Sequence, residues 1–212
     1  RKNGDDYVIY RGQSVDEDLF PKLGREKYKC PNRFQFEMKI FNEFKRLSHT
    51  HLNKEYNDWD ILAIAQHFGL PTRLLDWTTN PLTALWFAIS DIPTAPKRVV
   101  WCYSFEQSEI VDMNSGTPFE QTKTLVYQPK HISNRIVSQN GWFTSHYYGN
   151  SNNIYTALNI KKGTQEKLIK INIDISENNE RKTLLNDLDT YGINAYSLFN
   201  DLIVSSLTIL AS

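Results

Sequence analysis

The sequence predicts a single α+β domain over residues 1–212, with a mixed or antiparallel β-sheet core flanked by helices. Short runs of β-branched and aromatic residues occur between longer segments whose apolar residues recur at helical spacing. Hydrophobic residues make up 40% of the 212 positions and aromatic residues 13%, which is enough for a sizeable core. No internal repeat, low-complexity tract or linker divides the chain.

The first half of the chain begins with a strand and continues with helices. Tyr7–Ser14 is aromatic and β-branched and ends in Arg-Gly, so we expect a strand there. Arg33–Leu52 has Phe and Met residues at helical spacing and predicts an amphipathic helix. Asp58–Gly69 predicts a second helix, which Asp58 caps at its start and Gly69 ends.

A strand and a helix follow within the run "AQHFGLPTRLLDWTTNPLTALWFAIS", from Ala65 to Ser90. The segment 72–77, "TRLLDW", predicts a buried strand. "NPLTALWFAIS" predicts a helix with Asn80 as its N-cap and Pro81 at its first position, where proline is tolerated.

The second half is predicted to complete the sheet. Residues Glu106–Lys130 are irregular and polar and are expected to form a long surface excursion. Arg135–Tyr148 alternates like two strands around Asn140-Gly141, which predicts a hairpin. The other predicted elements are strands at Lys97–Phe105 and Lys167–Ile175, a helix over Glu180–Gly192 ended by Gly192, and a short helix from Ala195 onward.

Charge and cysteine content argue against several classes of protein. The 24 basic and 24 acidic residues cancel, which removes the simplest argument for a nucleic-acid or anionic-membrane binder. No apolar run is long enough for a membrane span, and the first residues do not resemble a signal peptide. Cys30 and Cys102 are far apart without a CxxC motif, so we expect buried thiols in a reducing cytoplasm. Because the chain begins at Arg1 rather than Met, we expect it to be trimmed or part of a longer protein.

Arg11 and Gly12 are the first candidate site residues. An Arg at the end of a strand presents a planar cationic fork that suits a phosphate or pyrophosphate, and the Gly lets a ligand approach the backbone. A pairing of Arg11 with a core carboxylate explains the motif equally well.

The run from Ala65 to Ser90 carries the densest group of polar candidates. Gln66 and His67 end a helix, and Thr72 and Arg73 precede the strand. Because side chains alternate along a strand, Asp76 and Thr78 share one face with Leu74, while Leu75 and Trp77 share the other. Asp76 and Thr78 are therefore expected to line a cleft. The alternatives are an ion pair of Asp76 with Arg11 or Arg73, and a purely helix-capping role for Thr79 and Asn80.

No metal site and no common catalytic motif is predicted. His49 and His51 are two residues apart on a helix and point to different faces. The patterns HExxH, GxxxxGK[ST], GxGxxG and GxSxG are all missing from the sequence.

"YRGQS" together with "AQHFGLPTRLLDWTTNPLTALWFA" resembles the FRG domain family, named for its (F/Y)RG motif, and the long central stretch matches the family pattern nearly letter for letter. Two further stretches, "RIVSQNGWFT" and "LLNDLDTYGINAYSLFNDL", are similar to later parts of that pattern, with Asn200 in place of the usual Pro. The resemblance therefore covers almost the whole chain.

The sequence is also distantly similar to ADP-ribosyltransferases of the Arg–Ser–Glu type, whose first strand ends in Y-R-G. Here Tyr10–Gly12 corresponds to that element, and Asp76–Thr78 lies where a serine-containing strand is usual. The resemblance implies that Arg11 holds the phosphates of NAD and that Asp76 and Thr78 wall the nicotinamide pocket. The serines are replaced, and Gln139 is the positional counterpart of the catalytic Glu. The negative charge that stabilises the ribose cation is then expected from Asp76 or Glu37.

The resulting prediction is a cytoplasmic NAD-dependent ADP-ribosyltransferase or NAD-cleaving enzyme that acts as an effector or toxin, in phage defence, with NAD as substrate. Arg11, Asp76, Thr78 and Gln139 are the predicted catalytic residues. The predicted NAD-binding residues are Tyr10, Gly12, Gln66, His67, Thr72, Arg73 and Trp77, with Trp77 stacking on a ring. The expected partners are a protein or nucleic-acid acceptor and an antitoxin or regulator, without a membrane. Two alternatives stay open: a non-catalytic nucleotide- or nucleic-acid-binding module, and a structural role in which Asp76 pairs with an Arg.

Overall fold

The protein is built around one six-stranded antiparallel sheet with the strand order β4-β5-β2-β1-β3-β8. The computed structural model describes residues 6–28, 30–91, 97–114, 116–149, 154–175 and 177–199. The predicted α+β fold with an antiparallel sheet is confirmed. The strands of the sheet are β1 (Asp6–Gln13), β2 (Leu74–Thr78), β3 (Arg98–Glu106), β4 (Leu125–Tyr127), β5 (Gly141–Ser145) and β8 (Leu168–Ile173). Two short strands, β6 (Tyr148–Gly149) and β7 (Ile154–Tyr155), pair separately.

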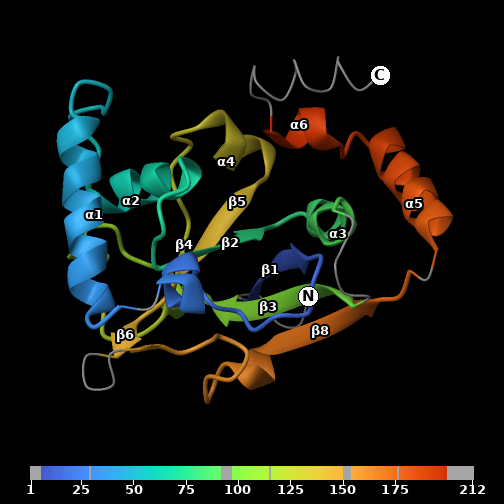
Figure 1. Cartoon of the computed structure of the whole chain (residues 1–212), viewed down its shortest axis with the longest axis horizontal. Coiled ribbons are helices and arrows are strands. Elements are labelled where there is room, and N and C mark those ends of the chain that lie inside the picture. The colour runs from blue at the N-terminus through green and yellow to red at the C-terminus, as the bar shows by residue number, and fades with distance from the viewer. Residues whose placement is uncertain are drawn as a thin grey trace.

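Helices surround this sheet on more than one side (Figure 1). They are α1 (Arg33–Leu47), α2 (Asp58–His67), α3 (Pro81–Ile89), α4 (Asn134–Ser138), α5 (Asn178–Thr190) and α6 (Ala195–Phe199). Four short 3-10 helices, η1 (Lys22–Gly24), η2 (Glu26–Tyr28), η3 (Gln107–Glu109) and η4 (Gln165–Lys167), lie between them. Helices α1 and α2 lie together at one end of the sheet, and α3 lies next to β1 and β3 (Figure 1).

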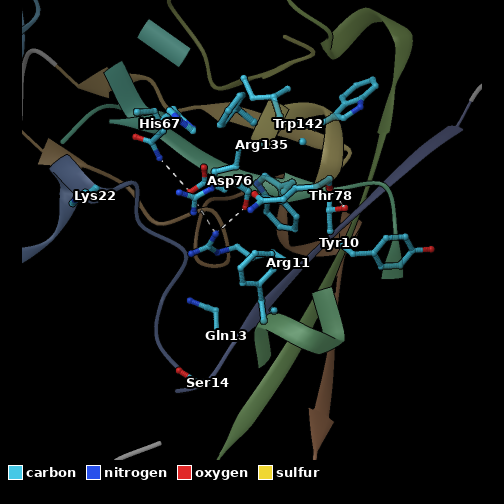
Figure 2. Close-up of a pocket in the computed structure, with 18 of the residues that line it drawn as sticks. Tyr10, Arg11, Gln13, Ser14, Lys22, His67, Asp76, Thr78, Arg135 and Trp142 are labelled. Atoms are coloured by element: carbon cyan, nitrogen blue, oxygen red, sulfur yellow. Dashed lines mark hydrogen bonds and ion pairs between the residues drawn. The ribbon is translucent and has the colours of Figure 1, made fainter. Parts of the chain in front are cut away.

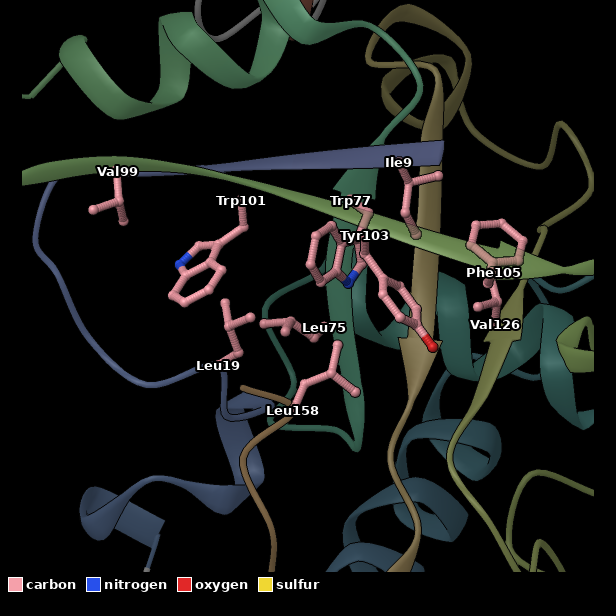
Figure 3. Packing of buried hydrophobic residues seen from close by; sticks show 10 residues of the cluster. All are labelled: Ile9, Leu19, Leu75, Trp77, Val99, Trp101, Tyr103, Phe105, Val126 and Leu158. Atoms are coloured by element: carbon pink, nitrogen blue, oxygen red, sulfur yellow. The ribbon is translucent and has the colours of Figure 1, made fainter. Parts of the chain in front are cut away.

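The alternation of side chains along the strands separates the hydrophobic core into clusters on the two faces of the sheet. Ile9, Val99 and Trp101 belong to a cluster that also contains Leu75 and Trp77. Figure 3 shows this cluster on one side of β3, with α3 on the other side. On the α3 side, Ala84 and Ala88 of α3 pack against Val100. Leu74 instead packs with Phe41, Trp59 and Leu62 of α1 and α2. The prediction that Leu74 and Leu75 face opposite sides is therefore confirmed.

Local capping explains where the helices begin. Asn80 caps α3 by accepting a hydrogen bond from the Leu82 backbone N–H at 2.9 Å, and Pro81 occupies the first helical position as predicted. Helix α2 is capped by Asn57 in a capping box with Asp60, rather than by Asp58 as expected. Gly192 follows α5 with φ of 76°, in agreement with its predicted role as a helix stop.

Three sequence-based predictions about the elements are wrong. Arg135–Tyr148 does not form a hairpin, because Ser133 caps a helix there, α4, and Ile136 of that helix is buried. Asn140, with φ of 47°, ends this helix before β5 begins, and β5 pairs with β2 and β4. Helix α1 ends at Leu47 rather than Leu52. The excursion between β3 and α4 contains the strand β4 and the short helix η3. The predicted C-terminal helix is described only over α6, and the rest of that prediction, from residue 200 onward, falls outside the described residues.

Candidate functional site

A cleft of about 610 Å³ opens where β1 and β2 meet. These two strands pair at a single register position, Tyr10↔Thr78, whereas β1 pairs with β3 along its whole length. The walls of the cleft are formed by β1 and the segment after it, by α2, by the end of β2, and by α3, α4 and β5. Its volume lies within the range of about 300–1,000 Å³ that is typical of small-molecule sites.

Arg11 is the central cation of the cleft. Its Nη1 donates a hydrogen bond to the main-chain oxygen of Asp76 at 2.8 Å and lies 4.0 Å from Asp76 Oδ2. Figure 2 shows the two residues joined by these contacts inside the cleft. Burial lowers the pKa of the Arg11 guanidinium, the Asp76 carboxylate opposes this shift, and the nearby Arg25 adds to it. The buried Nε–H of Arg11 has no hydrogen-bond partner among the described residues. Arg11 is therefore a poorly compensated cation whose polar end faces a cleft.

Asp76 supplies a carboxylate at the same place. Its side chain is 60% exposed, and its Oδ2 accepts a hydrogen bond from Gln66 Nε2 at 3.2 Å. Thr72 fixes the orientation of the Gln66 amide by donating its hydroxyl to Gln66 Oε1 at 2.7 Å. The amide nitrogen of Gln66 consequently faces Asp76, and Thr72 acts only through Gln66, since it is itself fully buried.

Thr78 and Gln139 also line the cleft, but their polar groups join secondary-structure elements. The Thr78 hydroxyl donates to the main-chain oxygen of Gln139 at 2.6 Å and accepts from the Asn80 N–H at 3.0 Å. Gln139 Nε2 donates to the main-chain oxygen of Leu198 at 3.2 Å. These bonds connect β2, α3, α4 and α6 at the edge of the cleft.

The comparison with protein families bears on the elements that carry Arg11 and Asp76. Residues 6–96 match the FRG domain family. A search of curated proteins found no match, and a search of solved structures found none either. The FRG match includes Tyr10–Gly12 and the entire run from Ala65 to Ser90, which confirms the resemblance predicted for these stretches. The resemblance of the stretches after residue 96 stays a prediction.

Two polar residues of the FRG segment lie away from the cleft, contrary to expectation. Arg73 is 1% exposed and makes a bidentate ion pair with Glu37, whose Oε2 lies 2.6 Å from Arg73 Nη2. Glu37 also accepts a hydrogen bond from the Tyr155 hydroxyl at 2.9 Å. Because both charges are buried and satisfied in this cluster, Arg73 is not placed to bind NAD and Glu37 is not placed to stabilise a ribose cation.

The expected roles of Trp77, Gly12 and Tyr10 also need correction, although all three line the cleft. The Trp77 indole is 3% exposed and donates to Thr144 Oγ1 at 3.0 Å, so it packs in the core instead of stacking on a ligand. A Cβ at Gly12 would lie 1.8 Å from the main-chain oxygen of Ala84, so the packing of helix α3 by itself requires a glycine here, and a role in ligand approach stays a prediction. Tyr10 packs in the α3 cluster, and its ring points away from Arg11 (Figure 2).

His67 lines the cleft at the end of α2, next to Gln66, as predicted. Its ring also contacts Phe68 edge-on, with ring centroids 5.0 Å apart. His67 and Gln66 thus belong to the α2 wall, on the Asp76 side of the site.

Several residues of the cleft were not predicted from the sequence. Lys22, Arg25 and Arg135 are cationic and Trp142 is aromatic, and all four line it. The segment "PKLGREK" carries two of these cations and begins at Pro21, eight residues after the last residue of β1, and this closeness in sequence was an available signal. No local signal indicates that Arg135 and Trp142 reach the same cleft, because their elements are brought there by the pairing of β5 with β2.

Other expectations concern groups outside the cleft. Cys30 and Cys102 are both free and are only partly buried, where full burial was expected. Burial raises the pKa of the Cys102 thiol. The described residues contain no group of three or more His, Cys, Asp or Glu side chains arranged to hold a metal ion. Across the described ranges, no helix combines the length and the apolar character needed to cross a membrane.

Proposed function

We propose that the cleft binds NAD and breaks its nicotinamide–ribose bond, as an ADP-ribosyltransferase or an NAD-cleaving enzyme. The observation that carries this proposal is the pairing of a partly satisfied guanidinium with an exposed carboxylate in one cleft. Arg11 Nη1 lies 4.0 Å from Asp76 Oδ2, and the Nε–H of Arg11 has no partner among the described residues.

A phosphate group is the ligand that best suits Arg11. Burial disfavours an uncompensated guanidinium, and an anion bound next to it would offset that cost. A guanidinium binds phosphate oxygens through its planar set of N–H donors. Lys22 and Arg25, which also line the cleft, add further positive charge to it.

Asp76 is suited to the bond-breaking step. When the bond between C1′ of the ribose and the nicotinamide nitrogen breaks, nicotinamide leaves as a neutral molecule with the bonding electron pair. Positive charge then develops on the ribose, and a fixed carboxylate stabilises it in the transition state. Gln66 holds Asp76 Oδ2 at 3.2 Å, which leaves the exposed carboxylate able to face the sugar.

The reaction is completed by a nucleophile at C1′. Water gives ADP-ribose and releases its proton to solvent, whereas a hydroxyl, amine or carboxylate of a protein or nucleic acid gives a transferred ADP-ribose. Thr78 and Gln139 contribute by fixing the end of β2 and the start of α3, since their polar groups are engaged between elements.

The test is nicotinamide release from NAD by the purified protein, with and without cell lysate as a source of acceptor. Asp76→Asn should lower the rate at saturating NAD by about 100-fold, because it removes a charge that acts in the transition state. Arg11→Ala should mainly raise the KM for NAD. Arg46→Ala and Asp187→Asn are matched controls, because these residues are exposed on α1 and α5 and do not line the cleft.

The outcome separates the enzyme from its alternatives. If the wild-type protein releases no nicotinamide under either condition, the enzymatic proposal is abandoned. Binding of NAD or a nucleotide without turnover would instead favour the non-catalytic module. If Asp76→Asn unfolds the protein, Asp76 has a structural role, so thermal unfolding of each variant is measured alongside its activity.

A further inference from the structure

Helix α4 contributes a cation to the cleft that the sequence analysis did not assign to the site. Arg135 is half-buried and lines the cleft, as Arg11 does, although the two residues lie on different elements. Figure 2 shows both side chains in the same view of the pocket.

Among the described residues, no hydrogen bond or ion pair engages the guanidinium of Arg135. Its Cζ lies 4.8 Å from the centroid of the Phe199 ring, a cation–π contact that uses none of its N–H donors. Two buried arginines, Arg73 and Arg181, use donors within the fold instead. Arg73 binds Glu37, and Arg181 Nη1 donates to the main-chain oxygens of Ile89 and Ser90. An arginine held by an aromatic face keeps its five N–H donors for a ligand.

Helix α6 holds this wall of the cleft in place. The main-chain oxygen of Leu198 accepts hydrogen bonds from Ser138 Oγ at 2.8 Å and from Gln139 Nε2 at 3.2 Å, which attaches the end of α4 to α6. The Phe199 ring also packs edge-on against Phe87 of α3, with centroids 6.1 Å apart. Phe87, Gln139 and Arg135 all line the cleft, so α6 contacts three of its residues without lining it itself.

We infer that Arg135 is a second anion-binding residue of the cleft, positioned by Phe199, and that it binds one phosphate of a diphosphate whose other phosphate contacts Arg11. The identity of the ligand as a nucleoside diphosphate or dinucleotide rests on the proposed function. Arg11 and Arg135 lie on separate elements of the cleft, so each guanidinium can bind one of two linked phosphates, and a diphosphate gains a charge-assisted contact that a monophosphate bound at Arg11 alone lacks. The cleft should therefore prefer ADP to AMP.

The preference for ADP is tested by titration calorimetry with the full chain and three ligands: ADP, AMP and inorganic pyrophosphate. Arg135→Ala should weaken ADP binding by about 10- to 100-fold, the effect of one lost charge-assisted contact, and should weaken AMP binding less. Arg135→Lys should recover only part of the affinity, since a single ammonium replaces a planar fork. Arg46→Ala should leave all three affinities unchanged.

Phe199 is tested as a positioning residue through its coupling to Arg135. Phe199→Leu should weaken ADP binding, because it removes the aromatic face that Arg135 contacts. Phe199→Tyr keeps that face and should bind ADP as tightly as the wild type. In the Arg135→Ala background, Phe199→Leu should have no additional effect on ADP affinity. An equal effect of Phe199→Leu in both backgrounds would mean that Phe199 acts on the fold in general, and would overturn its assignment.

The results distinguish this inference from the proposed function. If Arg11→Ala abolishes ADP binding and Arg135→Ala leaves it unchanged, the role of Arg135 is overturned and the proposed function is kept. If both variants lose ADP binding and the wild type releases no nicotinamide, the two-arginine site is supported and the proposed reaction fails. If the wild type binds none of the three ligands and releases no nicotinamide from NAD, both proposals are overturned.

Discussion

Gly12 offers the most direct test of how the Arg-Gly motif is used. Sequence reasoning assigned this glycine to the approach of a ligand, whereas the structure places it under helix α3. A Cβ built at Gly12 would lie 1.8 Å from the main-chain oxygen of Ala84 and 2.7 Å from the main-chain nitrogen of Ala88. Both neighbours are backbone atoms, which cannot rotate away as a side chain can.

The cost of Gly12→Ala follows from this geometry. Bringing the Ala84 oxygen from 1.8 Å to at least 3.0 Å requires a displacement of 1.2 Å, and α3 is held by its packing on β1 and β3. Overpacking of this kind costs about 1–3 kcal/mol, and we expect the upper end because the contact is to backbone. Replacing glycine by alanine also lowers the conformational entropy of the unfolded chain, which stabilises the folded protein by only about 0.4–1 kcal/mol. The net loss of stability should therefore be about 2 kcal/mol.

Urea unfolding measures this loss. With an m-value of about 1–3 kcal/mol/M, the midpoint of Gly12→Ala should fall by roughly 1 M. Gly149→Ala is the control, because a Cβ there would be 3.6 Å from its nearest neighbour, at ordinary contact distance. An unchanged midpoint together with lost ADP or NAD binding would refute the packing explanation and return Gly12 to the ligand.

Two further predictions concern buried groups. Arg73→Leu should destabilise the protein by about 3–5 kcal/mol, because Glu37 stays buried without its partner. Adding Glu37→Leu to this variant should recover part of the lost stability. If the two substitutions change the free energy of urea unfolding additively, the buried ion pair does not explain the loss. Burial lowers the pKa of His146 from 6.5 to about 3. The unfolded state then binds the proton first, so stability falls as pH drops from 6.5 toward 3, by up to about 1.4 kcal/mol per pH unit. His146→Gln should show a shallower fall between pH 6 and 4, and an unchanged slope would contradict the pKa shift.

The parts of the fold that could be predicted depend on neighbouring residues in sequence. The cap at Asn80, Pro81 at the first position of α3 and the left-handed Gly192 after α5 are local features with known residue preferences. The opposite facing of Leu74 and Leu75 follows from strand geometry alone. These predictions needed no knowledge of which segments meet in space.

The errors arose where a distant segment decides the outcome. Arg73 carries the charge expected of a ligand-binding residue, but Glu37 on α1 neutralises it across 36 positions of sequence. The stretch from Arg135 alternates like a strand, yet a cap at Ser133 and the burial of Ile136 favour a short helix. Sequence periodicity does not distinguish a five-residue helix from a short strand.

The many polar residues in the run from Ala65 to Ser90 have two separate roles. Buried polar groups at a corner of the sheet need hydrogen-bond partners within the protein. The polar side chains that bond to neighbouring segments in this way are those of Thr72, Arg73, Thr78 and Asn80. Besides Thr78, the polar side chains of the run that line the cleft are those of Gln66, His67 and Asp76, and none of them is a fixed cation. Positive charge for an anionic ligand must then come from outside this run, from Arg11, Lys22, Arg25 and Arg135. The run that resembles the FRG family most strongly thus contributes the carboxylate of the cleft. The cations of the cleft come from other elements: Arg11 from β1, Lys22 from η1, Arg25 from the position after η1, and Arg135 from α4.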